Sequence, residues 1–159
     1  MRITIIAVGK VKEAFYRDAI AEYTKRLSRY AKVHIIEVAD EQTPDHMSII
    51  EEEQIKEKEA IRICKHFKED AYRIALAIEG KQRDSISFSK HMESRCLYDT
   101  SHLQFIIGGS LGLSKTILSQ VDEHMSFSKM TFPHQLMRVV LLEQIYRGFR
   151  IMKGEPYHK

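Results

Sequence analysis

Cysteine is scarce in this sequence: Cys64 and Cys96 are the only two among 159 residues. Each lies in a stretch with a helical pattern, and their number and spacing match neither a disulfide framework nor a zinc site. The pair formed by Cys64 and His66 is the nearest approach to a metal-ligand spacing, and chance explains it. We therefore expect no metal.

Long apolar runs are also absent. The longest runs fall far short of the roughly 20 residues that cross a bilayer, so we expect no membrane partner. The first apolar run ends at Gly9-Lys10 and leads into a charged amphipathic segment, unlike a signal peptide. We found no repeat, no low-complexity segment and no linker. These absences predict one domain spanning residues 1–159, with a cytoplasmic location as the default.

Charge is unevenly distributed around a net value of +3. Residues 10–32 carry seven basic and three acidic side chains, residues 40–70 carry five basic and ten acidic, and residues 129–159 carry six basic and two acidic. Solvated helix faces would produce the same pattern. If the two basic regions meet in space, however, they form a surface that attracts phosphate.

Strand and helix patterns alternate along the chain. Strands are predicted at 2–8, 32–38, 72–78, 103–107 and 124–127, a turn at 79–81, and helices at 11–30, 48–67, 85–97, 114–120 and 134–152. This alternation predicts an α/β fold with a mostly parallel sheet. Ligands of such sheets bind beyond the carboxyl ends of the strands. We therefore expect the loops after Ile78, Ile107 and Phe127 to converge on one pocket.

The helix predicted at 134–152 is apolar on nearly all sides. Its polar residues form two narrow strips, His134 with Arg138, and Glu143 with Arg147 and Arg150. A helix with this pattern is buried on more than one side. In so short a chain this favours a partner subunit; the alternative is a central core helix without a partner.

The glycine cluster Gly108-Gly109-Ser110-Leu111-Gly112 follows a predicted strand and precedes a helix, where backbone N–H groups can approach a ligand. It is not the GxGxxG pattern of dinucleotide-binding proteins, and it lacks the lysine of a phosphate-binding loop. A nucleotide-binding oxidoreductase is therefore disfavoured. The alternative reading is a tight turn without a ligand.

Two further segments have unusual compositions. Residues 127–132 place Phe, Met and Phe in a predicted loop, which favours either a flat apolar ligand such as adenine or a subunit interface. The tail at 154–159 contains Tyr157 and His158 after a stiffening proline. In a nucleic-acid site, such a pair supplies a stacking ring and a group that exchanges protons near neutral pH.

The runs SFSKMTFPHQLMRVVLLEQIYR, FIIGGSLG and PYHK, together with the initial ITIIAVGK, resemble the RlmH family over the whole chain. These proteins are small SPOUT-class methyltransferases. The resemblance implies a deep trefoil knot and a homodimer. It also implies S-adenosyl-L-methionine as the cofactor and methyl transfer to N3 of a pseudouridine in large-subunit (23S) ribosomal RNA, on the assembled ribosome. Periodicity alone predicts an open sheet without a knot.

The resemblance also carries residue roles. The implied cofactor contacts are Leu76, Gly108, Gly109, Phe127, Ser128, Lys129, Met130, Thr131 and Phe132. The implied substrate side comprises His134 and Arg138, and the implied catalytic group comprises Glu143, Arg147, Tyr157 and His158. Gly148 departs from the pattern, because we expect alanine there. A non-enzymatic ribosome-binding or RNA-binding factor is the alternative, and it predicts no cofactor pocket.

These roles suggest a mechanism. The tail of one subunit closes over the pocket of the other, and His158 or a bound water accepts the N3 proton. Arg147 steadies the base or a phosphate, and Glu143 orients Arg147. His134 and Arg138 either face the RNA backbone or pair with polar groups at the interface.

Overall fold

Five parallel strands form the central sheet of the computed structural model, which describes residues 1–159. In chain order the elements are β1 (Arg2–Val8), α1 (Ala14–Leu27), β2 (Lys32–Val38), α2 (Ile49–Cys64), β3 (Tyr72–Gln82), α3 (Ser85–Tyr98), β4 (His102–Ile107), α4 (Lys115–Ser119), β5 (Glu123–Ser126) and α5 (His134–Met152). The strand order is β2-β1-β4-β3-β5. The predicted α/β class and parallel sheet are confirmed.

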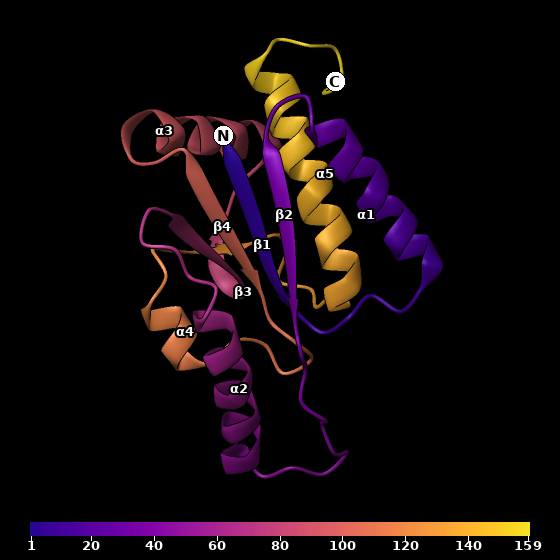
Figure 1. Cartoon of the computed structure of the whole chain (residues 1–159), viewed down its shortest axis with the longest axis vertical. Coiled ribbons are helices and arrows are strands. Elements are labelled where there is room, and N and C mark those ends of the chain that lie inside the picture. Colours follow the sequence, from indigo (N-terminus) through magenta and orange to yellow (C-terminus); the bar gives the residue numbers. More distant parts are fainter.

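Helices cover both faces of the sheet (Figure 1). On one face, α1, α3 and α5 pack on a core of 17 buried residues that includes Ile5, Phe105 and Leu142. On the other face, α2 and α4 pack on a core of seven that includes Ile63, Ile106 and Ile117. Because it is covered on both faces, β4 is buried at all six positions. No helix of the chain is long and apolar enough to cross a membrane.

The capping and periodicity patterns of the sequence predicted most element boundaries to within a few residues of those in the structure. Helix α5 begins and ends where its pattern predicts, whereas α1 begins three residues later than predicted. Ser48 caps α2 through the predicted box, with its hydroxyl accepting from the Glu51 N–H at 3.2 Å and its own N–H donating to the Glu51 carboxylate at 2.7 Å.

The turn predicted at 79–81 is wrong, because β3 continues to Gln82. Its pairing with β5 shifts register, so that Leu76 and Lys81 both face Met125 and the residues between them leave the ladder. Gly80 permits this, since a Cβ there would lie 2.5 Å from the Met125 carbonyl carbon. The irregularity therefore depends on contact with a strand more than 40 residues away in the sequence, which a local pattern does not report.

Helix α5 lies between α1 and α3 over the sheet (Figure 1), and none of its residues is fully exposed. Neighbouring elements of the same chain bury much of α5, and the partner subunit that its pattern favours stays a prediction. Leu136, Val139 and Val140 are among its apolar side chains that are only partly buried.

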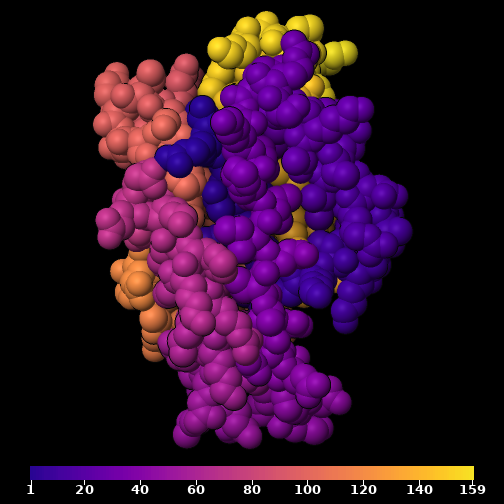
Figure 2. Space-filling model, viewed as in Figure 1, coloured from indigo at the N-terminus to yellow at the C-terminus, as the bar shows by residue number.

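The two basic regions meet in space because α1 packs against α5. Arg26 of α1 lies over the ring of Tyr146 of α5, 5.8 Å from its centroid. The acidic segment is elsewhere: α2 projects from the end of the molecule opposite the C-terminal tail (Figure 2). The fold therefore places the two basic regions together and the acidic segment apart from them, which is the arrangement that the charge pattern left open.

Candidate functional site

A cavity with a volume of about 720 Å³ lies at the carboxyl ends of β4 and β5, beside the irregular part of β3. Three loops line it: residues 76–79 where β3 leaves its ladder, residues 107–113 after β4, and residues 125–134 from the end of β5 to the start of α5. We call it the loop cavity. The segments after β4 and β5 are loops that the strand-end argument selected, whereas residues 76–79 lie within the irregular part of β3, which continues to Gln82. The two loops line one cavity because parallel strands end at the same edge of the sheet.

Eight of the nine residues assigned to the cofactor by resemblance line the loop cavity. They are Leu76, Gly108, Gly109, Phe127, Ser128, Met130, Thr131 and Phe132. Lys129 does not line it and is exposed on the outer side of the loop. Twelve of the 22 lining residues are hydrophobic, and Met130 is 72% exposed. The cavity thus has the size and mixed lining of a small-molecule site.

The glycine loop forms one wall of the loop cavity by folding back on itself. Gly109 and Gly112 form an isolated antiparallel bridge, and Gly112 has a φ of +84°. A Cβ on Gly108 would lie 2.7 Å from the Gly112 backbone. A side chain at 108 is therefore excluded, and the backbone itself borders the cavity.

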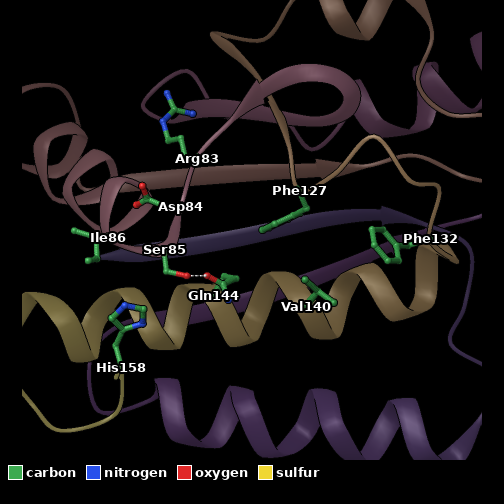
Figure 3. Close-up of a pocket in the computed structure, with 9 residues that line it drawn as sticks. All are labelled: Arg83, Asp84, Ser85, Ile86, Phe127, Phe132, Val140, Gln144 and His158. Atoms are coloured by element: carbon green, nitrogen blue, oxygen red, sulfur yellow. Dashed lines mark hydrogen bonds between the residues drawn. The ribbon is translucent and has the colours of Figure 1, made fainter.

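A second, smaller cavity of about 460 Å³ lies beside the loop cavity and shares Phe127 and Phe132 with it. We call it the helix cavity, since its other walls are the start of α3 and the side of α5 (Figure 3). Its polar lining residues are Arg83, Asp84, Ser85, Gln144 and His158. Sequence reasoning missed Arg83, Ser85 and Gln144, because only the packing of α3 against α5 brings them together.

The four residues assigned to catalysis form one connected cluster, which we call the tail cluster. Arg147 donates to the Glu143 carboxylate through Nη2 at 2.6 Å, and the hydroxyl of Tyr157 donates to the same oxygen at 3.2 Å. Nη1 of Arg147 lies 3.4 Å from Nδ1 of His158. The tail of this chain thus packs back on its own α5.

Burial and charge modify two members of the tail cluster. Burial, and then the negative charge of Glu143, raise the pKa of Tyr157 to about 12. The hydrogen bond to Glu143 raises the pKa of Arg147 above its ordinary value. At neutral pH, Tyr157 is therefore a hydrogen-bond donor and Arg147 a fixed cation.

The two residues assigned to the substrate lie in different surroundings. Arg138 is fully buried and donates to Glu37 and to the carbonyls of Val8 and Gly9. A guanidinium without exposed surface does not reach a phosphate, so in this structure Arg138 is a structural residue rather than one that faces RNA. His134 lines the loop cavity, where burial, followed by the charge of Arg138, lowers its pKa.

The structure contains no cluster of His, Cys, Asp and Glu with the arrangement of a metal site. Cys64 and Cys96 are both free.

Comparison with known proteins gives a consistent relationship. The family model described as "Predicted SPOUT methyltransferase" matches residues 1–158. The chain is 62% identical over its full length, and over that of the relative, to the Ribosomal RNA large subunit methyltransferase H of Bifidobacterium adolescentis. It is 57% identical, again over the whole of both chains, to the protein of the same name from Clostridium kluyveri.

A solved structure supports the fold independently. The structure of a probable methylase family protein from Haemophilus influenzae Rd KW20 is similar to this one, with a TM-score of 0.51 and 10% sequence identity. The matched region comprises 99% of this chain and 70% of that protein. At this identity the likeness concerns the fold alone. The family model over residues 1–158 and the full-length relatives show that the chain belongs to the RlmH family of SPOUT methyltransferases.

Proposed function

We propose that this protein uses S-adenosyl-L-methionine to methylate N3 of a pseudouridine in large-subunit (23S) ribosomal RNA. Family membership supports methyl transfer, and the names of the relatives support ribosomal RNA as the substrate. The observation that carries the proposal is the loop cavity, since eight of the nine implied cofactor residues line it. A non-enzymatic RNA-binding factor would need no such cavity.

The residues of the loop cavity fit the proposed cofactor. Leu76, Met130 and Phe132 supply apolar contacts for an adenine ring, whose polar edge is satisfied by backbone groups of the three loops. Gly108 and Gly109 let the backbone approach a ribose or a carboxylate closely. The bound cofactor supplies a methyl group on a sulfonium sulfur, which reacts by in-line displacement.

The tail cluster supplies groups for the acceptor base. N3 of a pseudouridine carries a weakly acidic proton that must leave before N3 attacks. We assign His158, or a water that it holds, as the proton acceptor, because its ring is exposed and lines the helix cavity. Arg147 holds the base or a phosphate in position, and Glu143 orients Arg147 through the hydrogen bonds that join them.

We further propose a homodimer in which the tail of one chain completes the loop cavity of the other. Arg147 lies thirteen residues along α5 from His134, which is about 20 Å at 1.5 Å per residue. The tail cluster is therefore displaced from the His134 end of its own loop cavity. The partly buried Val140 lines the helix cavity together with Phe132 and Ile86, and these three side chains supply an apolar contact for a second copy.

A trefoil knot is part of the same proposal, supported by membership in the SPOUT family. A single-molecule pulling experiment tests it. A knotted chain, once fully stretched, remains shorter than the contour of about 3.3–3.6 Å per residue that an unknotted chain reaches.

RNA recognition in the proposal rests on the positive surface where α1 meets α5. Such contacts are electrostatic and weaken with salt. We therefore propose the assembled ribosome as the substrate, since it offers more phosphates and a defined shape.

Mass spectrometry of large-subunit RNA tests the proposed function. Purified protein, S-adenosylmethionine and ribosomes from cells lacking the enzyme should give one pseudouridine heavier by a methyl group at N3. Methylation at another nucleotide would refute the substrate, and the absence of methylation on ribosomes, subunits and free RNA would refute the function.

A further inference from the structure

The ion pair between Arg147 and Glu143 uses only one carboxylate oxygen. Nε and Nη2 of Arg147 donate to Oε1 of Glu143 at 3.0 and 2.6 Å. Arginine frequently pairs with a carboxylate through both oxygens, in two parallel hydrogen bonds. Here the second oxygen, Oε2, instead accepts from Nε2 of Gln144 at 2.7 Å. The neighbouring glutamine thus occupies the position that the usual pairing would need.

Gln144 is itself held from another helix. The hydroxyl of Ser85, at the start of α3, donates to Oε1 of Gln144 at 2.7 Å (Figure 3). Adjacent positions on a helix do not face each other, so a contact between side chains 143 and 144 needs a restraint. Ser85 supplies it, because an amide oxygen directed toward α3 leaves the amide N–H groups directed toward Glu143.

This restraint has consequences for the tail. With Oε2 occupied, Oε1 accepts three hydrogen bonds, two from Arg147 and one from the Tyr157 hydroxyl at 3.2 Å. The guanidinium lies over the Tyr157 ring, 4.7 Å from its centroid, and directs Nη1 toward His158. Without Gln144, rotation of the carboxylate would give both oxygens to Arg147 and remove the partner of Tyr157.

We propose that Gln144, oriented by Ser85, is a positioning residue that holds Glu143 in the one-oxygen arrangement and so fixes Tyr157 and His158 for catalysis. The role in catalysis rests on the function proposed above. The arrangement of Glu143, Gln144 and Arg147 does not rest on that function, because its contacts can be measured without RNA or cofactor. It also links the start of α3 to the tail through the hydrogen bond between Ser85 and Gln144.

The test compares Gln144→Leu with wild type by two readouts. The first is the titration of the Tyr157 ring, followed by NMR in protein with ¹³C-labelled tyrosine and assigned with Tyr157→Phe. We expect the pKa of Tyr157 to fall only in part from about 12, because burial, the largest cause of its rise, remains and only the hydrogen bond to the carboxylate is lost. The second is methyl transfer, where we expect turnover to fall roughly ten- to a hundredfold with unchanged affinity for S-adenosylmethionine.

The serine gives a matched pair should Gln144→Leu fold poorly. Ser85→Ala removes the hydroxyl and should lower the pKa of Tyr157, as Gln144→Leu does. Ser85→Thr keeps the hydroxyl and should leave the Tyr157 titration as it is in wild type. Gln120→Leu is the control, since that glutamine is exposed at the end of α4, remote from the tail.

An unchanged Tyr157 titration in both Gln144→Leu and Ser85→Ala would overturn the proposal, whatever happens to turnover. A shifted titration with normal turnover would overturn the positioning role. If wild-type protein transfers no methyl group and yet Tyr157 shifts in the variants, the proposed function fails while the arrangement of Glu143 stands.

Discussion

Arg138 donates through Nη1 to Oε2 of Glu37 at 2.6 Å, although the two residues are 101 positions apart in the sequence. The arginine is fully buried, and its Nη2 donates to the carbonyls of Val8 and Gly9. The first turns of α5 are thereby fixed to the carboxyl ends of β1 and β2. His134, one turn earlier on α5, is consequently held at the wall of the loop cavity.

This pair predicts a large stability effect. Glu37→Ala removes the counter-charge of a buried guanidinium, but Glu37 itself is 37% exposed, so we expect the free energy of unfolding to fall by about 1.5–3 kcal/mol in urea denaturation. Glu22→Ala is the matched control, because Glu22 forms an exposed i,i+4 pair with Arg26. Its loss should lower the free energy of unfolding far less than the loss of Glu37, because solvent screens an exposed pair. Equal losses in the two variants would contradict this assignment.

Stability should decline on mild acidification. His102 is buried, with its Nε2 2.9 Å from the Thr4 hydroxyl, and burial lowers its pKa below the ordinary 6.5. Below pH 6.5 the unfolded chain binds a proton that the folded chain binds less readily. The stability that neutral His102 contributes is complete above pH 6.5 and is lost as the pH falls through the lowered pKa.

Urea denaturation at pH 7.5 and at pH 5.5 measures this effect. The slope contributed by His102 is at most about 1.4 kcal/mol per pH unit. His102→Gln should show a shallower pH dependence than wild type between these two values. An equally steep dependence in that variant would assign the acid sensitivity to other groups, such as the similarly shifted His134.

Two glycines should respond differently to alanine. In Gly80→Ala the new Cβ would lie 2.5 Å from the Met125 backbone, so the β5 strand itself would have to shift. In Gly148→Ala the nearest atom, at 2.3 Å, is the terminal methyl of Met92, which can rotate away. We expect a large loss of stability and of cofactor affinity in the first variant. In the second variant we expect little net change in stability, because a gain of roughly 1 kcal/mol in helix propensity offsets the cost of repacking Met92.

Calorimetric cofactor titration and thermal unfolding distinguish the two glycine variants. Gly80→Ala with wild-type affinity and stability would mean that the irregular pairing of β3 with β5 tolerates a side chain, contrary to the geometry at Met125.

The tail predicts an inactive enzyme that still binds its cofactor. Deleting residues 156–159 removes Tyr157 and His158, so methyl transfer should be lost while the affinity for S-adenosylmethionine is retained. Unchanged turnover would exclude the tail from the mechanism.

Mixed dimers test whether the tail acts on the partner's cavity. A tail-deleted chain is combined with a chain whose loop cavity is blocked, each inactive alone. If the tail acts in trans, the mixed dimer regains activity, because one cavity receives an intact tail from the other chain. If the tail acts on its own cavity, the mixture stays inactive.

Much of the fold follows from local patterns. The alternation at β1, the capping box at Ser48 and the apolar run of β4 each depend on nearby residues, so the sequence alone placed these elements. The resemblance placed the residues around the loop cavity, and strand-end reasoning had selected the loops after β4 and β5 independently.

Features that depend on long-range contacts could not be predicted in this way. The continuation of β3 past Ile78 depends on Met125, and the helix cavity depends on how α3 meets α5. The apolar pattern of α5 indicated burial but not which surface provides it, and the structure assigns most of that surface to α1 and α3. Arg138 was assigned to RNA because sequence shows a charge without showing Glu37 beside it.

Binding of S-adenosylmethionine by cavity variants tests the central claim most directly. Ile78 lines the loop cavity and is 48% exposed, while Ile86 lines the helix cavity and is 44% exposed, so tryptophan at either position adds bulk without disturbing the core. Calorimetry should show that wild type and Ile86→Trp bind S-adenosylmethionine but not NAD, and that Ile78→Trp binds it at least tenfold more weakly (about 1.4 kcal/mol). Equal affinity in all three proteins, or binding of NAD in preference, would contradict the assignment of the loop cavity to the methyl donor.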